Sequence, residues 1–196
     1  MKPRTRTVVK PAEPAVSLDR FKAHARISHN LEDDLLRGFM WDATEHFQAR
    51  TFQTLIKTTY IQDQDGWTNP ICLRESPLIA VESISYYDAD NQLQTLDLAT
   101  VHVVTEDHSP GQICLADGQT WPETAVRPDA VQIRYTAGVA EVPDDLPQDI
   151  QTAVCMIAAY RNEERSAVNV GNIVNQMPLA VDITINRWKT GYYANP

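Results

Sequence analysis

The sequence predicts an α+β fold: a small helical bundle, built from N-terminal and C-terminal helices, with an inserted antiparallel β-rich subdomain. Apolar residues recur at helical spacing in one segment before the middle of the chain and in one segment after it. Between them, residues 52–140 form short alternating segments that are broken by Pro, Gly and Asp. Because no helix-like segment separates these strands, we expect them to pair antiparallel.

Two helices are expected before the β-rich region, and each begins with a capping residue. Ser17 should cap a short helix that ends near Ser28, and Asn30 should cap a longer helix. The longer helix has an apolar stripe wide enough to be covered from two sides. This stripe consists of Leu31, Leu35, Leu36, Phe39, Met40, Ala43 and Phe47.

The helical segment after the β-rich region opens with Asp144, Asp145 and Pro147, which are typical of a helix N-terminus, and should end near Arg165. Its apolar stripe consists of Ile150, Ala153, Val154, Ile157, Ala158 and Tyr160. A last short helix is expected from Pro178. Its apolar face consists of Val181, Ile185, Trp188 and Tyr192.

The clearest strand is Val81–Tyr87, and Asp88–Asn91 should turn the chain so that Gln92–Leu96 returns as its hairpin partner. About six or seven strands are expected in total. The others lie within residues 55–60, 71–73, 101–104, 112–115 and 131–136.

Residues 1–16 contain basic residues and prolines, which indicates a flexible basic N-terminal arm. The arm is either a frayed terminus or a segment that becomes ordered against an acidic neighbour or phosphate. The rest of the chain is expected to divide into a helical core, the β-rich subdomain, and a loop with a C-terminal docking tail. The helical core consists of residues 17–51 and 144–165, and the β-rich subdomain consists of residues 52–140. The loop and docking tail are residues 166–196.

The composition of the 196-residue chain is that of a globular protein with its own core, with 43% hydrophobic and 22% charged residues. A formal charge of −9 argues against sequence-specific binding of duplex DNA, which requires cationic side chains to neutralise phosphate. Three widely spaced cysteines, Cys72, Cys114 and Cys155, are expected to be reduced core thiols of a cytoplasmic product. No apolar segment has the length of a membrane span or a signal peptide.

The sequence contains no motif for a phosphate-binding loop, a dinucleotide site, a zinc protease or a nucleophile elbow. Asp63–Gly66 resembles part of a calcium loop, but Arg74 stands where a bidentate Glu is required, so we interpret this segment as a turn. We therefore expect no enzymatic activity, no metal site and no cofactor.

The C-terminal tail is rich in aromatic and basic residues, a composition typical of interaction hot spots. We expect it to dock on another chain, and the alternative is that it folds back on its own helical bundle. Its candidate docking residues are Ile183, Ile185, Arg187, Trp188, Tyr192 and Tyr193.

Two further groups are candidates for contacts between subunits. Arg161, Glu164 and Arg165 end the second major helix, either as a solvated terminus or as part of an ion-pair ring between subunits. Trp67 and Trp121 lie in turns beside prolines, where they either cap the β subdomain or form a surface for a ligand or partner.

Several motifs, taken in order, carry a resemblance to a known family. The most telling is Ile71-x-Leu73-x-x-x-Pro77-Leu78 followed by Val81-x-Ser-Ile84-x-Tyr86-Tyr87-Asp88. Further motifs are Ser17-Leu18, Arg26-Ile27, Asp33-Asp34-x-Leu36, Trp121-Pro122, Arg127-Pro128 and Val131-x-Ile133-x-Tyr135-Thr-Ala-Gly138. With these motifs, residues 17–193 resemble the head–tail connector (adaptor or head completion) proteins of long-tailed phages and gene transfer agents. The chain departs from the family at Ile185-Asn-Arg187-Trp188, where a proline often precedes a closing Tyr-Arg.

The resemblance implies a structural virion protein that forms a ring, expected to be dodecameric, below the portal in the virion neck. It implies that the ring joins the DNA-filled head to the tail, extends the DNA channel, and is assembled in the host cytoplasm. The implied partners are the portal protein, which the C-terminal tail would contact, a tail-side connector or tail terminator protein, and further copies of the chain. DNA would pass only as non-specific cargo, and no membrane is involved.

Two alternatives stay open at this point. One is a tail-side closure protein. The other is a ligand-binding or enzymatic module with a site between the β subdomain and the helices, for which the first candidates are Trp67, Trp121, His102 and Asp117.

Overall fold

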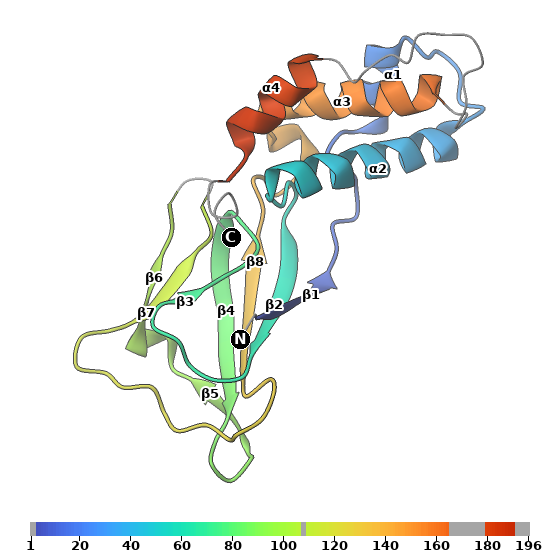
Figure 1. Cartoon of the computed structure of the whole chain (residues 1–196). Helices are drawn as coiled ribbons and strands as arrows, with labels where there is room; N and C mark the ends of the chain where they lie inside the picture. Colours follow the sequence, from blue (N-terminus) through green and yellow to red (C-terminus); the bar gives the residue numbers. More distant parts are fainter. Residues whose placement is uncertain (1–2, 107–108, 165–178, 191–196) are drawn as a thin grey trace. The chain divides into compact units, whose positions relative to one another are not determined.

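The computed structural model describes residues 3–106, 109–164 and 179–190, and it shows two compact units (Figure 1). The β unit contains the N-terminal residues up to Pro11 together with residues 57–139, and the helical unit contains residues 12–56 and 140–189. The strands of both sheets pair antiparallel, and the four α-helices found in the described residues lie outside the long β-rich segment. The α+β fold class is therefore confirmed.

The main sheet of the β unit has five strands in the order β1-β2-β8-β4-β5. They span Arg4–Val9 (β1), Thr58–Gln64 (β2), Leu78–Tyr87 (β4), Leu93–Leu96 (β5) and Val131–Ala137 (β8). A second sheet has the order β3-β7-β6, with Ile71–Cys72, Gln112–Leu115 and Val101–Val104. The hairpin expected from the alternating pattern is confirmed, because Ile84 of β4 lies opposite Leu96 of β5.

Apolar side chains from both sheets form the core of the β unit. Ile84 and Tyr135 from the main sheet and Ile71 and Ile113 from the second sheet are fully buried in one cluster. The two sheets come close at Gly111, where an added Cβ would lie 2.2 Å from Leu78 Cδ2. A glycine is therefore required at this position for close approach of the backbone.

The helical unit consists of α1 (Leu18–Ala25), α2 (Asp33–Thr51), α3 (Gln148–Glu163) and α4 (Leu179–Trp188), with a short 3-10 turn at Pro143–Asp145 before α3. Buried residues of α2 and α3 follow the helical spacing that the sequence indicated. They are Leu36, Met40, Ala43 and Phe47 on α2, and Ile150, Ala153, Val154, Ile157 and Ala158 on α3.

The chain leaves and re-enters the helical unit at neighbouring positions. Ile56 and Ala140 form a parallel β-bridge, and the Ala140 N–H donates to the Leu55 carbonyl at 3.0 Å. The residues between these points form most of the β unit. In the order of the sequence, the β unit is therefore inserted between two segments of the helical unit.

The capping residues were predicted correctly for one helix and wrongly for the other. The Ser17 hydroxyl accepts from the Arg20 N–H at 3.4 Å and caps α1, as expected. Asn30 does not cap α2, which begins at Asp33. The Asn30 side-chain oxygen instead accepts from the Lys22 ammonium group at 2.6 Å, and the same ammonium contacts Asp33 at 2.6 Å.

Two other expectations differ from the structure. The N-terminal segment was expected to be a flexible arm that either frays or becomes ordered against an acidic neighbour or phosphate, whereas Arg4–Val9 forms an edge strand that pairs with β2 of the same chain. The stripe of α2 was expected to be covered from two sides, but Leu31 and Leu35 are 89% and 44% exposed. Apolar periodicity shows that a helix face can be buried, and it does not show which molecule buries it.

We expect Phe47→Ala to destabilise the chain by about 3–5 kcal/mol, because the fully buried ring would leave a cavity between α2 and α3. Urea unfolding followed by circular dichroism measures this change. Leu93→Ala is the matched control, since Leu93 is 58% exposed and its truncation should change the free energy of unfolding by less than about 0.5 kcal/mol. Equal effects of the two substitutions would contradict the assigned core.

Candidate functional site

The residues that the structure describes offer no group of three or more His, Cys, Asp or Glu side chains that could hold a metal ion. None of the described helices is both long enough and apolar enough to cross a membrane. Four features of the described residues are built from side chains that the sequence singled out or from their neighbours.

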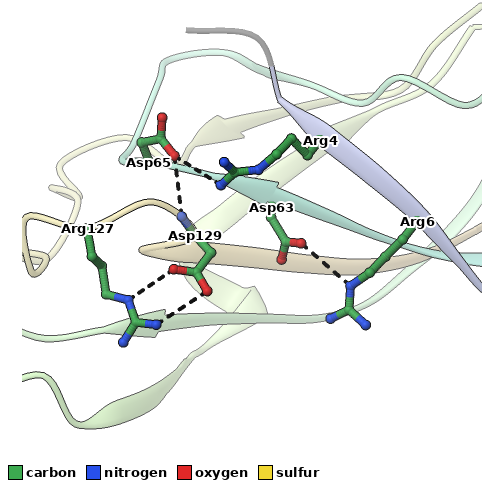
Figure 2. A network of polar contacts seen from close by, with 6 residues as sticks. All are labelled: Arg4, Arg6, Asp63, Asp65, Arg127 and Asp129. Atoms are coloured by element: carbon green, nitrogen blue, oxygen red, sulfur yellow. Dashed lines mark hydrogen bonds and ion pairs between the residues drawn. The ribbon is translucent and has the colours of Figure 1, made fainter.

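The first feature is a network of ion pairs that holds β1 on the main sheet (Figure 2). Arg4 contacts Asp65 at 3.2 Å, and Arg6 contacts Asp63 at 3.5 Å. The two carboxylates come from the end of β2 and the turn after it, the segment that resembled part of a calcium loop. Because both arginine side chains are more than half exposed, each pair alone adds little stability, and the network mainly sets the register of β1.

The network continues to the loop before β8. The Asp65 carboxylate also accepts from the Asp129 N–H at 3.3 Å, and the Asp129 carboxylate accepts from two nitrogens of Arg127 at 3.0 and 3.3 Å. Arg127 donates to Asn91 in the β4–β5 turn at 2.9 Å and lies 3.8 Å from the centre of the Tyr87 ring. The hydrogen bond with Asp129 raises the pKa of Arg127.

Part of this network lines an open hollow of about 600 Å³, whose lining residues are Arg4, Asp63, Asn91, Arg127, Pro128 and Asp129. Each arginine of the network faces a carboxylate, so the hollow has no excess of positive charge for a phosphate or other anion. The network of ion pairs connects the N-terminal strand, the turn after β2 and the loop before β8.

The second feature is the tryptophan pair. Trp67 and Trp121 stack with ring centres 4.4 Å apart and an angle of 3° between the planes, and both pack against the core of the β unit. The Trp67 indole N–H donates to the Pro122 carbonyl at 2.8 Å. This geometry is that of a cap on the β unit, one of the two roles that the sequence left open.

His102 and Asp117 were the other first candidates for a ligand site. His102 lies on β6 opposite Cys114, and Asp117 follows β7.

The third feature is a row of charged residues where α2 meets α3 and α4. Asp42, His46 and Arg50 are four residues apart along α2, and Asp42 pairs with Arg161 of α3 at 2.8 Å. Arg50 pairs with Asp182 of α4 at 3.1 Å. Arg161, a candidate for contacts between subunits, therefore has a partner within its own chain. Glu164 follows the end of α3, and Arg165 lies outside the described residues.

The fourth feature is α4, which contains four of the six candidate docking residues. Ile185 is buried in the helical unit, and the Trp188 indole N–H donates to the Asp149 carboxylate of α3 at 2.9 Å. The Trp188 carbonyl accepts from the Gln53 side chain at 2.7 Å. Ile185 and Trp188 thus fold back on the bundle, which was the alternative to docking on another chain.

The remaining tail candidates face solvent or lie outside the described residues. Ile183 is 61% exposed, and the Arg187 side chain is 74% exposed although it contacts Asp149 at 3.4 Å. Tyr192 and Tyr193 are not among the described residues. Sequence reasoning missed Asp149 as the anchor of α4, and the only signal for it was an acidic residue in the first turn of α3.

Acidification should destabilise the helical unit through His46. Partial burial of the imidazole, followed by the positive charges of Arg50 and Arg161, lowers the pKa of His46 below 6.5, and the carboxylates of Asp42 and Asp182 only partly oppose this shift. The unfolded chain then binds a proton more readily than the folded chain, so stability is retained above about pH 6.5 and lost as the pH falls toward the folded-state pKa.

The measurement is the free energy of unfolding in urea at several pH values between about 8 and 5, for the wild type and for His46→Gln. We expect the wild type to lose more stability than the variant below about pH 6.5. The same dependence on pH in both proteins would show that His46 does not contribute.

Comparison with known proteins agrees with the fold. Residues 15–109 match the family described as phage gp6-like head-tail connector protein. A chain from the neck of an empty gene transfer agent (GTA) particle computed with C6 symmetry is 24% identical, with a TM-score of 0.78 and 95% of each chain covered. Chains from the virion of a native GTA particle and from the neck of a native GTA particle computed with C12 symmetry are each 23% identical. For both, the TM-score is 0.75 and 95% of each chain is covered.

A comparison with curated protein sequences found no match. At these identities the similar structures establish a shared fold, and the family match rests on the sequence of the first half of the chain. The resemblance to the head–tail connector family, which the ordered motifs indicated, is therefore confirmed.

Proposed function

We propose that this chain is a structural protein of the neck of a phage or gene-transfer-agent particle, where it forms a ring between the DNA-filled head and the tail. The observation that carries the proposal is the agreement of two comparisons. The connector family matches residues 15–109, and a neck chain of a GTA particle shares the fold over 95% of both chains. Such a role requires docking surfaces and no reacting group.

The proposed ring lies below the portal protein and extends the DNA channel toward a tail-side partner. The similar neck structures were computed with C6 and C12 symmetry, which is compatible with the dodecamer expected here. The formal charge of −9 fits a channel wall from which DNA phosphates are repelled, so that DNA passes as non-specific cargo. The chain would be found in the virion neck after assembly in the host cytoplasm.

The proposed portal contact is the exposed side of α4 and the residues that follow it. Ile185 and Trp188 hold α4 on the helical unit, whereas the side chains of Ile183 and Arg187 are largely exposed to solvent. Tyr192 and Tyr193 come directly after this helix in the sequence. Ile185 and Trp188 would position the docking surface. Ile183, Arg187 and the two tyrosines would contact the portal.

The test is binding of the purified chain to its portal protein, observed by co-purification and by negative-stain imaging. We expect the full chain to bind and a truncation after Thr190, which removes Tyr192 and Tyr193, to lose binding while keeping its circular dichroism spectrum. Ile183→Asp should also weaken binding. Deletion of all of α4 is unsuitable, because Val181 and Ile185 are buried and their removal would open the helical core.

Leu93→Asp is the matched control for Ile183→Asp, because Leu93 is similarly exposed but lies on β5. Normal portal binding by both the truncation and Ile183→Asp would refute the docking surface. A full chain that captures a tail-tube protein and not the portal would instead support the tail-side closure alternative.

A further inference from the structure

The turn that follows α2 contains a buried glutamine that is bonded to the end of α4. Gln53 is 3% exposed, and its side-chain Nε2 donates to the Trp188 carbonyl at 2.7 Å. This carbonyl belongs to the last turn of α4, where the carbonyl groups of a helix have no partner within the helix. Gln53 therefore closes the C-terminal end of α4 from a position 135 residues away in the sequence.

The backbone of this turn holds Gln53 in place. Phe52 ends α2 with a φ of 58°, a left-handed conformation that is uncommon for residues other than glycine. The Phe52 N–H donates to the Gln48 carbonyl, and the Leu55 N–H donates to the Gln48 side chain, both at 2.8 Å. The turn is thus tied to α2 on both sides of Gln53. Such conformations persist where the surrounding contacts determine them, and they are frequent at functional positions.

The stability of the core does not explain why this buried residue is an amide. The Oε1 atom of Gln53 is buried and has no hydrogen-bond partner among the described residues. A buried amide with one unpaired group costs free energy that an apolar side chain of similar size would avoid. The bond to the Trp188 carbonyl is therefore what distinguishes Gln53 from an apolar residue at this position.

Two other contacts hold the same end of α4. The Trp188 indole N–H donates to Asp149 Oδ2 at the start of α3 at 2.9 Å, and the Lys189 ammonium group lies 5.8 Å from the centre of the Phe52 ring. Trp188 is thus bound through its side chain to one segment and through its backbone to another. The segment that follows Lys189 in the sequence therefore starts from a held position.

We propose that Gln53 is a positioning residue for the C-terminal docking surface. By holding the Trp188 carbonyl, it fixes the end of α4 and the start of the segment that contains Tyr192 and Tyr193. This inference rests on the proposed function, in which that segment contacts the portal. A docking segment whose first residues are already held loses less conformational entropy on binding, so Gln53 raises the affinity without touching the partner.

The first test digests the folded full-length chain with a protease that cleaves after lysine. Lys2 and Lys10 precede proline and are poor sites, so the sites that remain are Lys22, Lys57 and Lys189. Cleavage after Lys189 reports local opening at the end of α4, whereas cleavage after Lys22, which is 9% exposed, reports opening of α1.

We expect Gln53→Met to accelerate cleavage after Lys189 by about threefold to tenfold, which corresponds to the loss of one hydrogen bond. Cleavage after Lys22 should stay at the wild-type rate. This comparison within one chain separates loss of the bond to α4 from a general loss of packing, which would accelerate cleavage at both sites.

Gln151→Met is the matched control. Gln151 is also 3% exposed, its Nε2 donates to the Leu146 carbonyl at 2.7 Å, and its Oε1 is buried without a partner among the described residues. The same substitution there removes an equivalent bond in the same helical unit but none to α4. We expect Gln151→Met to leave cleavage after Lys189 at the wild-type rate, and equal acceleration by both variants would overturn the proposal.

The second test measures the affinity of the full-length variants for the portal protein by surface plasmon resonance. We expect Gln53→Met to weaken portal binding by about threefold to tenfold while its circular dichroism spectrum stays that of the wild type. Gln151→Met should bind like the wild type.

Two further outcomes would overturn the proposal: cleavage of Gln53→Met after Lys189 at the wild-type rate, or portal binding by Gln53→Met with wild-type affinity. A wild-type chain that does not bind the portal would instead refute the proposed function. The digestion would then still decide whether Gln53 holds the end of α4, because it needs no partner protein.

Discussion

The structure depends on the burial of one apolar seam between α2 and α3, two helices from opposite ends of the sequence. Met40 and Phe47 on α2 and Ile157 on α3 are almost completely removed from solvent. The two helices also hold α4 in place. Asp149 at the start of α3 holds Trp188, and Arg50 near the end of α2 holds Asp182, so α4 is attached to both helices. The docking surface proposed for the portal is the part of α4 that this attachment leaves exposed.

Charge has a different effect in the two units. In the β unit, arginines and aspartates that are distant in sequence pair with each other and fix an edge strand, as Arg4 does with Asp65 and Arg6 with Asp63. In the helical unit the pairs connect helices, and His46 lies among two arginines and two aspartates that determine its protonation. The excess of acidic residues is not spread evenly, because residues 141–149 before α3 contain four carboxylates and no Lys or Arg.

Much of the fold could be predicted from sequence because the signals are local. The alternating pattern of Val101–Val104 and Gln112–Leu115 gave the bounds of β6 and β7, and Ser17 marked the start of α1. The errors came from contacts between distant residues. The N-terminal segment has the composition of a disordered arm, but it is ordered by backbone pairing with β2, which is distant in the sequence. Asn30 has the side chain of a helix cap, but the ammonium group of Lys22 engages its oxygen. Exposure of Leu31 follows from the same wrong cap, because α2 begins at Asp33 and leaves Leu31 in the turn before the helix.

The bridge between Ile56 and Ala140 has a consequence for how such proteins can vary. Both connections to the β unit start from adjacent backbone positions that are hydrogen-bonded through Leu55. Strands, turns and loops can therefore be lengthened, shortened or exchanged between these two points without a change in the helical framework. Changes in the β unit can then accumulate independently of the helices, as in modular proteins in which one domain is inserted into a loop of another.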